Sequence, residues 1–200
     1  MRSVAALAIA TALMLGTQNA GAAKCKYGED SVDPFTKVKT RTTKFDQLTA
    51  SWMTNQRELD ASIAVNSVDR EMQLWVLLDY TRQRRYGPSE SELRDTIVVL
   101  EDAPLLITMA DGSITILTAI DEVRKNAYSV PPEDHNFETD KFTIRAVATI
   151  RYGLEAAAVQ ALSSQHATSV RITAVNRNFD IEINKKSFKD FQRALGCIQS

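Results

Sequence analysis

Cysteine, proline and glycine are all scarce in this sequence of 200 residues, which contains 2, 5 and 7 of them respectively. The scarcity of glycine and proline excludes collagen-like and low-complexity chains, and a hydrophobic fraction of 44% excludes a disordered one. Positive charge is not in excess either, since 24 basic residues face 25 acidic ones, which argues against a nucleic-acid binder. What remains is an ordinary globular composition in about one domain's length of chain.

Residues 1–22 have the pattern of a secretory signal peptide. Arg2 supplies the positive start, residues 4–15 are apolar, and Ala20-Gly21-Ala22 matches the small residues required for cleavage. An uncleaved anchor is the alternative, but the apolar run is shorter than the roughly 20 residues that span a bilayer. We therefore expect export to the periplasm or the medium, with a mature chain formed by residues 23–200.

Export determines how the two cysteines are interpreted. Cys25 and Cys197 lie near the two ends of the expected mature chain, and an oxidising compartment favours a bond between them. A buried free thiol and a catalytic cysteine are the alternatives, but neither residue has a neighbouring histidine or a C-x-x-C partner that would lower a thiol pKa. We predict a structural disulfide.

Residues 105–118 have the pattern of a hairpin, because Asp111 and Gly112 fit a two-residue type I′ turn between two apolar, β-branched runs. Such a turn sets the register on the apolar face. The predicted cross-strand pairs are Met109 with Ile114 and Ile107 with Ile116.

A second hairpin is predicted over residues 169–184, with its turn centred on Asn176 and Arg177. The apolar pairs are Val170 with Ile183, Ile172 with Ile181, and Ala174 with Phe179. On the opposite face, this register pairs Arg171 with Glu182 and Thr173 with Asp180.

Two helices follow from apolar periodicity. Residues 154–162 are rich in alanine, and a second helix is predicted to begin after Asn184, which can cap it. Its apolar stripe is Phe188, Phe191, Leu195 and Ile198. We expect this helix to stop at Gly196.

The chain also suggests an internal duplication of residues 69–130 and 139–198. Arg85-Tyr86-Gly87 recurs as Arg151-Tyr152-Gly153, and each triplet follows a strand pattern and precedes a candidate helix. Two strand-helix-hairpin-helix units of about 65 residues would build one domain. The predicted fold class is therefore α+β, a mainly antiparallel sheet with covering helices.

No motif in the sequence identifies a reaction. Serine-hydrolase and phosphate-loop signatures are lacking, and neither histidine has ligands at zinc spacing. The acidic stretch of residues 131–140, which contains His135, lacks the glycine and the spacing of a calcium loop, so we expect a solvated loop there. The sequence predicts no metal and no cofactor.

One carboxylate pair, Asp180 and Glu182, shares a strand face with its side chains roughly 7 Å apart, a separation that suits an inverting glycosidase. A peptidoglycan hydrolase is therefore the alternative function. A surface ion pair with Arg171 is favoured, because no apolar pocket that would raise one carboxyl pKa is predicted.

Two basic clusters are the candidate binding residues. Lys37, Lys39 and Arg41 share one face of a predicted strand, while the second cluster lies beside Tyr86. The second cluster consists of Arg82, Arg84 and Arg85. Both can receive an acidic envelope protein or another acidic envelope component, although lysines on an edge strand also prevent aggregation. The sequence thus predicts an exported, non-catalytic binding protein of a bacterial-type cell envelope, such as an inhibitor, an immunity-type binder or an accessory subunit.

Overall fold

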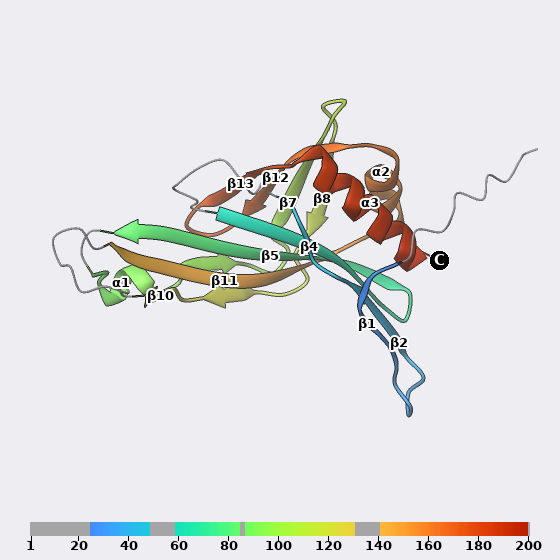
Figure 1. The fold of residues 1–200 in the computed structure, drawn as a ribbon, viewed down its shortest axis with the longest axis horizontal. Helices are drawn as coiled ribbons and strands as arrows, with labels where there is room; N and C mark the ends of the chain where they lie inside the picture. Colours follow the sequence, from blue (N-terminus) through green and yellow to red (C-terminus); the bar gives the residue numbers. More distant parts are fainter. Residues whose placement is uncertain (1–24, 49–58, 85–86, 131–140, 200) are drawn as a thin grey trace, which may run out of the picture.

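The computed structural model describes residues 25–48, 59–84, 87–130 and 141–199, of which 53% lie in strands and 18% in helices (Figure 1). The strands are β1 (Tyr27–Val32), β2 (Lys39–Thr43), β3 (Asp46–Gln47), β4 (Leu59–Val68), β5 (Glu71–Arg84), β6 (Ile97–Val99), β7 (Pro104–Met109), β8 (Ile114–Thr118), β9 (Val123–Lys125), β10 (Tyr128–Val130), β11 (Phe142–Gly153), β12 (Ala167–Thr173) and β13 (Asn178–Glu182). The helices are α1 (Glu90–Leu93), α2 (Ala156–Ser164) and α3 (Lys185–Gln199).

Three antiparallel sheets form the fold. The largest has the strand order β1-β2-β4-β5-β11-β10, and β3 also pairs with β4. A four-stranded sheet has the order β13-β12-β7-β8, and β6 and β9 form a two-stranded sheet. In Figure 1 the long strands β4, β5 and β11 run side by side across the molecule, with the four-stranded sheet and α3 above them.

The predicted α+β fold with covering helices is wrong, because the protein is a sheet-rich fold in which sheets cover sheets. Along most of the 14 residues of β5 and the 12 residues of β11, buried side chains alternate with more exposed ones, and β11 pairs with β5 along its whole length. The helix predicted after β5 is only the four-residue α1, and strands β9 and β10 stand where a helix was expected after the first hairpin. Residues 123–130 pair with β6 and β11 instead of forming a helix.

The core lies between the inner face of the large sheet and the elements above it. From the large sheet, Val76, Leu78 and Ile150 are buried in one apolar cluster with residues of the four-stranded sheet and α3. The long helix α3 contacts β2, β3, β4 and β12. The predicted apolar stripe of α3 is confirmed, since Phe188, Phe191, Leu195 and Ile198 are all buried.

The start of α3 is also as predicted, but its end is not. Asn184 caps the helix, as its Oδ1 accepts the backbone N–H of Lys186 at 2.8 Å. The helix does not stop at Gly196 but continues to Gln199. Cys197 therefore lies inside the last turn of α3.

The first predicted hairpin exists as β7 and β8, but its register is wrong by one residue. Gly112 donates its N–H to Met109 O at 3.0 Å, and Met109 donates to Ser113 O at 2.8 Å, so the loop has three residues. Only the glycine has a positive φ, as in a type I turn followed by a bulge. Ile114 then pairs with Thr108, and its side chain is 58% exposed.

The second predicted hairpin exists as β12 and β13, and its register differs from the prediction by two residues. Ala174 donates its N–H to Arg177 O at 3.1 Å, which places the turn one position earlier than expected. Arg171 consequently pairs with Asp180, and Glu182 pairs with Ser169. Because the shift is even, the predicted inner and outer faces are preserved.

The predicted disulfide between Cys25 and Cys197 is confirmed, with Cα atoms 5.8 Å apart across a sequence separation of 172 residues. It joins the segment before β1 to the last turn of α3. The hydroxyl of Tyr27 reinforces this junction by donating to the backbone oxygen of Cys197 at 3.1 Å. None of the helices in the described segments is both long and apolar enough to cross a membrane.

The internal duplication stays a prediction. In the described segments, α1 and α2 follow the two long strands β5 and β11, and each is followed later by a hairpin. The units differ after their hairpins, where the first has β9 and β10 and the second has α3. Arg85 and Tyr86 of the first triplet lie outside the described residues.

Candidate binding cleft

A polar hollow of about 700 Å³ lies where three elements meet: the β1–β2 hairpin, the tight turn between β4 and β5, and the last turn of α3. Its lining residues are Lys37, Lys39, Arg41, Ser67, Asp69, Arg70, Met72, Ile198 and Gln199. Four of these side chains are cationic and one is anionic. We call this hollow the cationic cleft.

The cationic cleft continues into a second, more apolar hollow of about 580 Å³ beside α2. The two hollows share Arg70, Met72 and Gln199. The floor of the second hollow includes Leu154 and Val159. A ligand in this continuous surface therefore meets positive charge at one end and apolar side chains at the other.

The cations of the cleft differ in how they are neutralised. Arg41 lies 3.5 Å from a carboxylate oxygen of Asp30 and 5.7 Å from the ring centre of Tyr27. Its Nε is buried without a hydrogen-bond partner among the described residues. In the same described segments, neither Lys39 nor Arg70 has a carboxylate within ion-pair distance.

Two of the cleft's cations also have unusual backbones. Lys37 has φ 62° and Arg70 has φ 74°, values in the left-handed region that glycine and asparagine prefer. Arg70 follows Asp69, with φ 47°, in the two-residue turn between β4 and β5, where type I′ geometry demands two positive φ angles. Long side chains at these positions cost about 1 kcal/mol each relative to the right-handed conformation.

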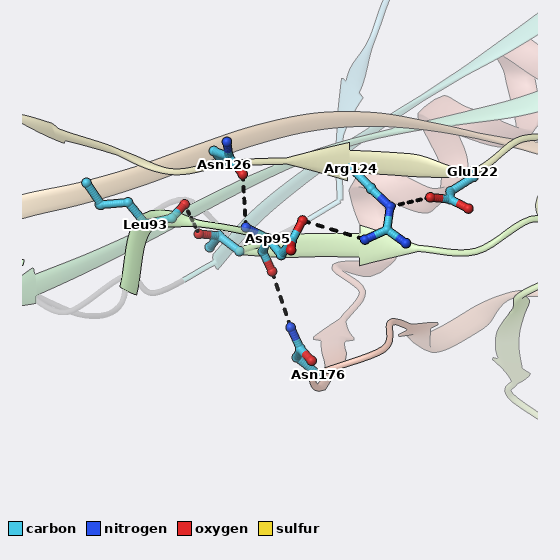
Figure 2. Close-up of polar contacts among 7 residues, drawn as sticks. Leu93, Asp95, Glu122, Arg124, Asn126 and Asn176 are labelled. Atoms are coloured by element: carbon cyan, nitrogen blue, oxygen red, sulfur yellow. Dashed lines mark hydrogen bonds and ion pairs between the residues drawn. The ribbon is translucent and has the colours of Figure 1, made fainter. Parts of the chain in front are cut away.

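Another left-handed residue, Asp95, has a structural explanation. Asp95, with φ 45°, lies two residues after α1 and contacts three residues from two other parts of the chain (Figure 2). Its N–H donates to Asn126 Oδ1 at 2.9 Å, its backbone oxygen accepts from Asn176 at 3.3 Å, and its carboxylate lies 3.7 Å from Arg124. Asp95 thereby joins α1 to β9 and to the β12–β13 turn, a role that Arg70 lacks.

The second predicted basic cluster does not join the first. The backbone oxygen of Lys39 accepts the N–H of Asp69, in the turn just before β5. Arg82 lies close to the other end of that 14-residue strand. A strand rises about 3.4 Å per residue, so roughly 40 Å separate Arg82 from Arg70. The backbone of Arg84 ends β5, while Arg85 and Tyr86 lie outside the described residues.

The carboxylates considered for hydrolysis lie on the flat outer face of the four-stranded sheet. Asp180 accepts two hydrogen bonds from Arg171, at 2.5 and 3.0 Å. This guanidinium holds the pKa of Asp180 below its usual value, which is the opposite of what a general acid requires. Glu182 is exposed beside it.

Nucleophile and metal chemistry find little support in the described residues. Both cysteines are joined in the disulfide, so neither is a thiol. The described segments contain no group of three histidine, cysteine or acidic side chains placed to hold a metal ion. The acidic stretch of residues 131–140, with His135, lies outside them.

Sequence reasoning missed Arg70 and the contribution of α3 to the cleft. An arginine gives no sequence signal for a left-handed backbone, so the turn position of Arg70 cannot be read from its residue type. The approach of Ile198 and Gln199 depends on the disulfide and on helix packing, which the local sequence does not encode. One sequence signal points to this site: the two turn positions between β4 and β5 are occupied by Asp69 and Arg70, whereas such a turn usually has asparagine or glycine.

Comparisons of the chain with protein-family models, with curated proteins and with solved structures find no match in any of the three. The chemistry of the cleft is therefore argued from its own residues.

Proposed function

We propose that this protein is an exported, non-catalytic binding protein of the cell envelope that holds an acidic partner in the cationic cleft. The observation that carries the proposal is the placement of Lys37 and Arg70. Both keep long cationic side chains at backbone positions where glycine would be less strained, and both line the same hollow. The two turns require a left-handed residue at these positions but not a cationic one, so the presence of lysine and arginine in place of glycine favours a binding role.

Electrostatics supports the same conclusion. An anion entering the cleft meets Lys39 and Arg70, neither of which has a carboxylate within ion-pair distance among the described residues, so it does not have to displace an ion pair there. The disulfide supports exposure to an oxidising compartment, in agreement with the expected export. Hydrolysis by Asp180 and Glu182 lacks comparable support, because Arg171 neutralises Asp180 on an open surface.

The test is a charge reversal in the cleft. Lys39→Glu combined with Arg70→Glu should reduce capture of material from an envelope extract by at least tenfold, because two charge-assisted contacts become repulsive. Capture by the wild type should also fall as salt is raised. Quantitative pull-down at two salt concentrations measures both effects.

The matched control is Arg82→Glu, which makes the same kind of charge change at the far end of β5 and should leave capture unaltered. If Arg82→Glu abolishes capture while the cleft variant retains it, the binding site lies in the second cluster and the cleft assignment is wrong. Circular dichroism of both variants must match the wild type for the comparison to count.

A further inference from the structure

The β1–β2 hairpin projects beyond the rest of the large sheet (Figure 1). The backbone contact of β2 with the β4–β5 turn ends where Asp69 donates its N–H to Lys39 O at 3.1 Å. Residues 33–38, which form the tip, extend past this point. The tip therefore stands next to the cationic cleft and leads away from the body of the protein.

The tip exposes two large apolar side chains. Phe35 is 91% exposed, more than any other large hydrophobic residue in the described segments, and Val32 is 55% exposed. The turn that presents Phe35 is well bonded. Asp33 Oδ1 accepts the backbone N–H groups of Phe35 at 2.8 Å and Thr36 at 2.7 Å, and Lys37 N–H donates to Asp33 O at 3.0 Å. The aromatic ring is thus held in water by an ordered turn.

Cationic groups lie directly behind this apolar tip. Lys37 Nζ donates to Pro34 O at 2.7 Å, and Lys39 pairs with Val32 across the hairpin. The acidic residues of the hairpin are engaged locally. Asp33 closes the turn, Asp30 faces Arg41, and Glu29 accepts a hydrogen bond from the Ser31 hydroxyl. An approaching surface therefore meets Phe35 first, then Lys37, Lys39 and the cleft.

An apolar aromatic tip backed by lysines is complementary to the interface of an anionic bilayer. Aromatic rings favour the headgroup region, and each lysine near an anionic surface adds an attraction that salt weakens. We propose that the β1–β2 hairpin docks this protein on an anionic phospholipid membrane, with Phe35 and Val32 in the interface and the cleft's cations against lipid phosphates. This inference rests on the proposed function, because it identifies the acidic partner of the same cleft.

The experiment is co-sedimentation of the disulfide-intact chain, residues 23–200, with vesicles of phosphatidylcholine alone or mixed with phosphatidylglycerol. Binding is expected only to the mixed vesicles and should decrease as salt is raised. Phe35→Ala should weaken it by about tenfold, since the ring's burial in the interface is lost. Lys39→Gln should weaken it by about fivefold. Phe45→Ala, an exposed phenylalanine away from the tip, is the control and should have no effect.

A second readout detects insertion directly. Phe35→Trp should shift its fluorescence emission to the blue when mixed vesicles are added, relative to Phe45→Trp. Failure of the wild type to bind mixed vesicles, equal binding to both vesicle types, or binding unaffected by Phe35→Ala would overturn the inference. If vesicles are not bound while envelope capture still depends on Lys39 and Arg70, the acidic partner is not a phospholipid membrane and the membrane inference fails, while the proposed function stands. If neither occurs, both proposals fail.

Discussion

The cationic cleft and the outer face of the four-stranded sheet both present arginine, but they treat its charge in opposite ways. On the sheet face, Arg171 makes two hydrogen bonds to its cross-strand partner Asp180. In the cleft, Arg70 has no carboxylate partner in the described segments and sits on a left-handed backbone. Paired charge on a flat sheet satisfies itself, whereas unpaired charge in a hollow leaves a field for an external anion.

The difference between the surfaces follows from their geometry. Regular antiparallel pairing places side chains of neighbouring strands within reach, so opposite charges meet without any special arrangement. The cleft is built at the ends of elements, where a hairpin, a tight turn and a helix terminus converge and no pairing rule applies. Its residues are held in place by the Cys25–Cys197 bond and by Tyr27, which contacts both Cys197 and Arg41.

The largest expected effect comes from removing that bond. Replacing both cysteines by serine should lower the free energy of unfolding by about 2–4 kcal/mol. Loop-closure entropy predicts a stabilisation of about 5 kcal/mol for so long a loop, and measured disulfides often stabilise by less than this prediction. Envelope capture should fall as well, because Ile198 and Gln199 follow Cys197 directly. Urea denaturation with and without reductant measures the stability.

We expect the loss of the disulfide to leave the outer face of the four-stranded sheet unchanged. The Asp180 carboxyl should keep its lowered pKa in the serine variant under native conditions, which a carbon-detected NMR titration can follow. A return of the Asp180 pKa to its ordinary value would show that the two surfaces are coupled.

A smaller effect, of opposite sign, is expected at the β4–β5 turn. Arg70→Gly should stabilise the protein by about 0.5–1 kcal/mol, because glycine adopts a positive φ without steric cost. Partner capture should nevertheless decrease, since the cation is lost. Thermal unfolding and pull-down on the same preparation provide the two readouts.

Lys39→Gly is the matched variant for this prediction. It removes a cleft cation from a regular strand position, where glycine is unfavourable, so it should destabilise the protein while also reducing capture. If Arg70→Gly behaves like Lys39→Gly in stability, the left-handed strain argument is incorrect.

The smallest effect is expected on the sheet face. Asp180→Asn should change stability by no more than about 0.5 kcal/mol at neutral pH, because an exposed ion pair is screened by solvent. Pairing with Arg171 lowers the pKa of Asp180. The stabilisation of the folded state by this ion pair is therefore fully present above the ordinary aspartate pKa and is lost as the pH falls through the lowered pKa. Any peptidoglycan turnover by the wild type that disappears in this variant would restore the hydrolase hypothesis.

Some of this structure was readable from the sequence because the relevant signals are local. The stripe that includes Phe188 and Leu195 defines one face of α3, and two cysteines in a chain allow only one intramolecular bond. The faces of β12 and β13 followed from alternation, because an even shift in register leaves Ile172 inside.

Other features could not be predicted, because the same residues are compatible with more than one turn geometry or depend on contacts between distant segments. Asp111 and Gly112 fit both a two-residue turn and a three-residue bulged loop. The bulged loop is selected, with Asp111 Oδ1 accepting the N–H of Ser113 at 2.9 Å, and the odd shift exposes Ile114. In the cleft, the alternation of Lys37, Lys39 and Arg41 is a local sequence pattern. The proximity of this cluster to Arg70 depends on the pairing of β2 with β4, which brings together residues far apart in the chain.

The sequence separation of 172 between Cys25 and Cys197 imposes an order on maturation. Cys25 is synthesised long before its partner, so the bond can close only after both long strands, β5 and β11, have been made. Until then, among the described strands, the β1–β2 hairpin is joined to the rest of the large sheet through the pairing of β2 with β4. The end of the molecule that carries the β1–β2 hairpin is therefore fastened last, when α3 is in place.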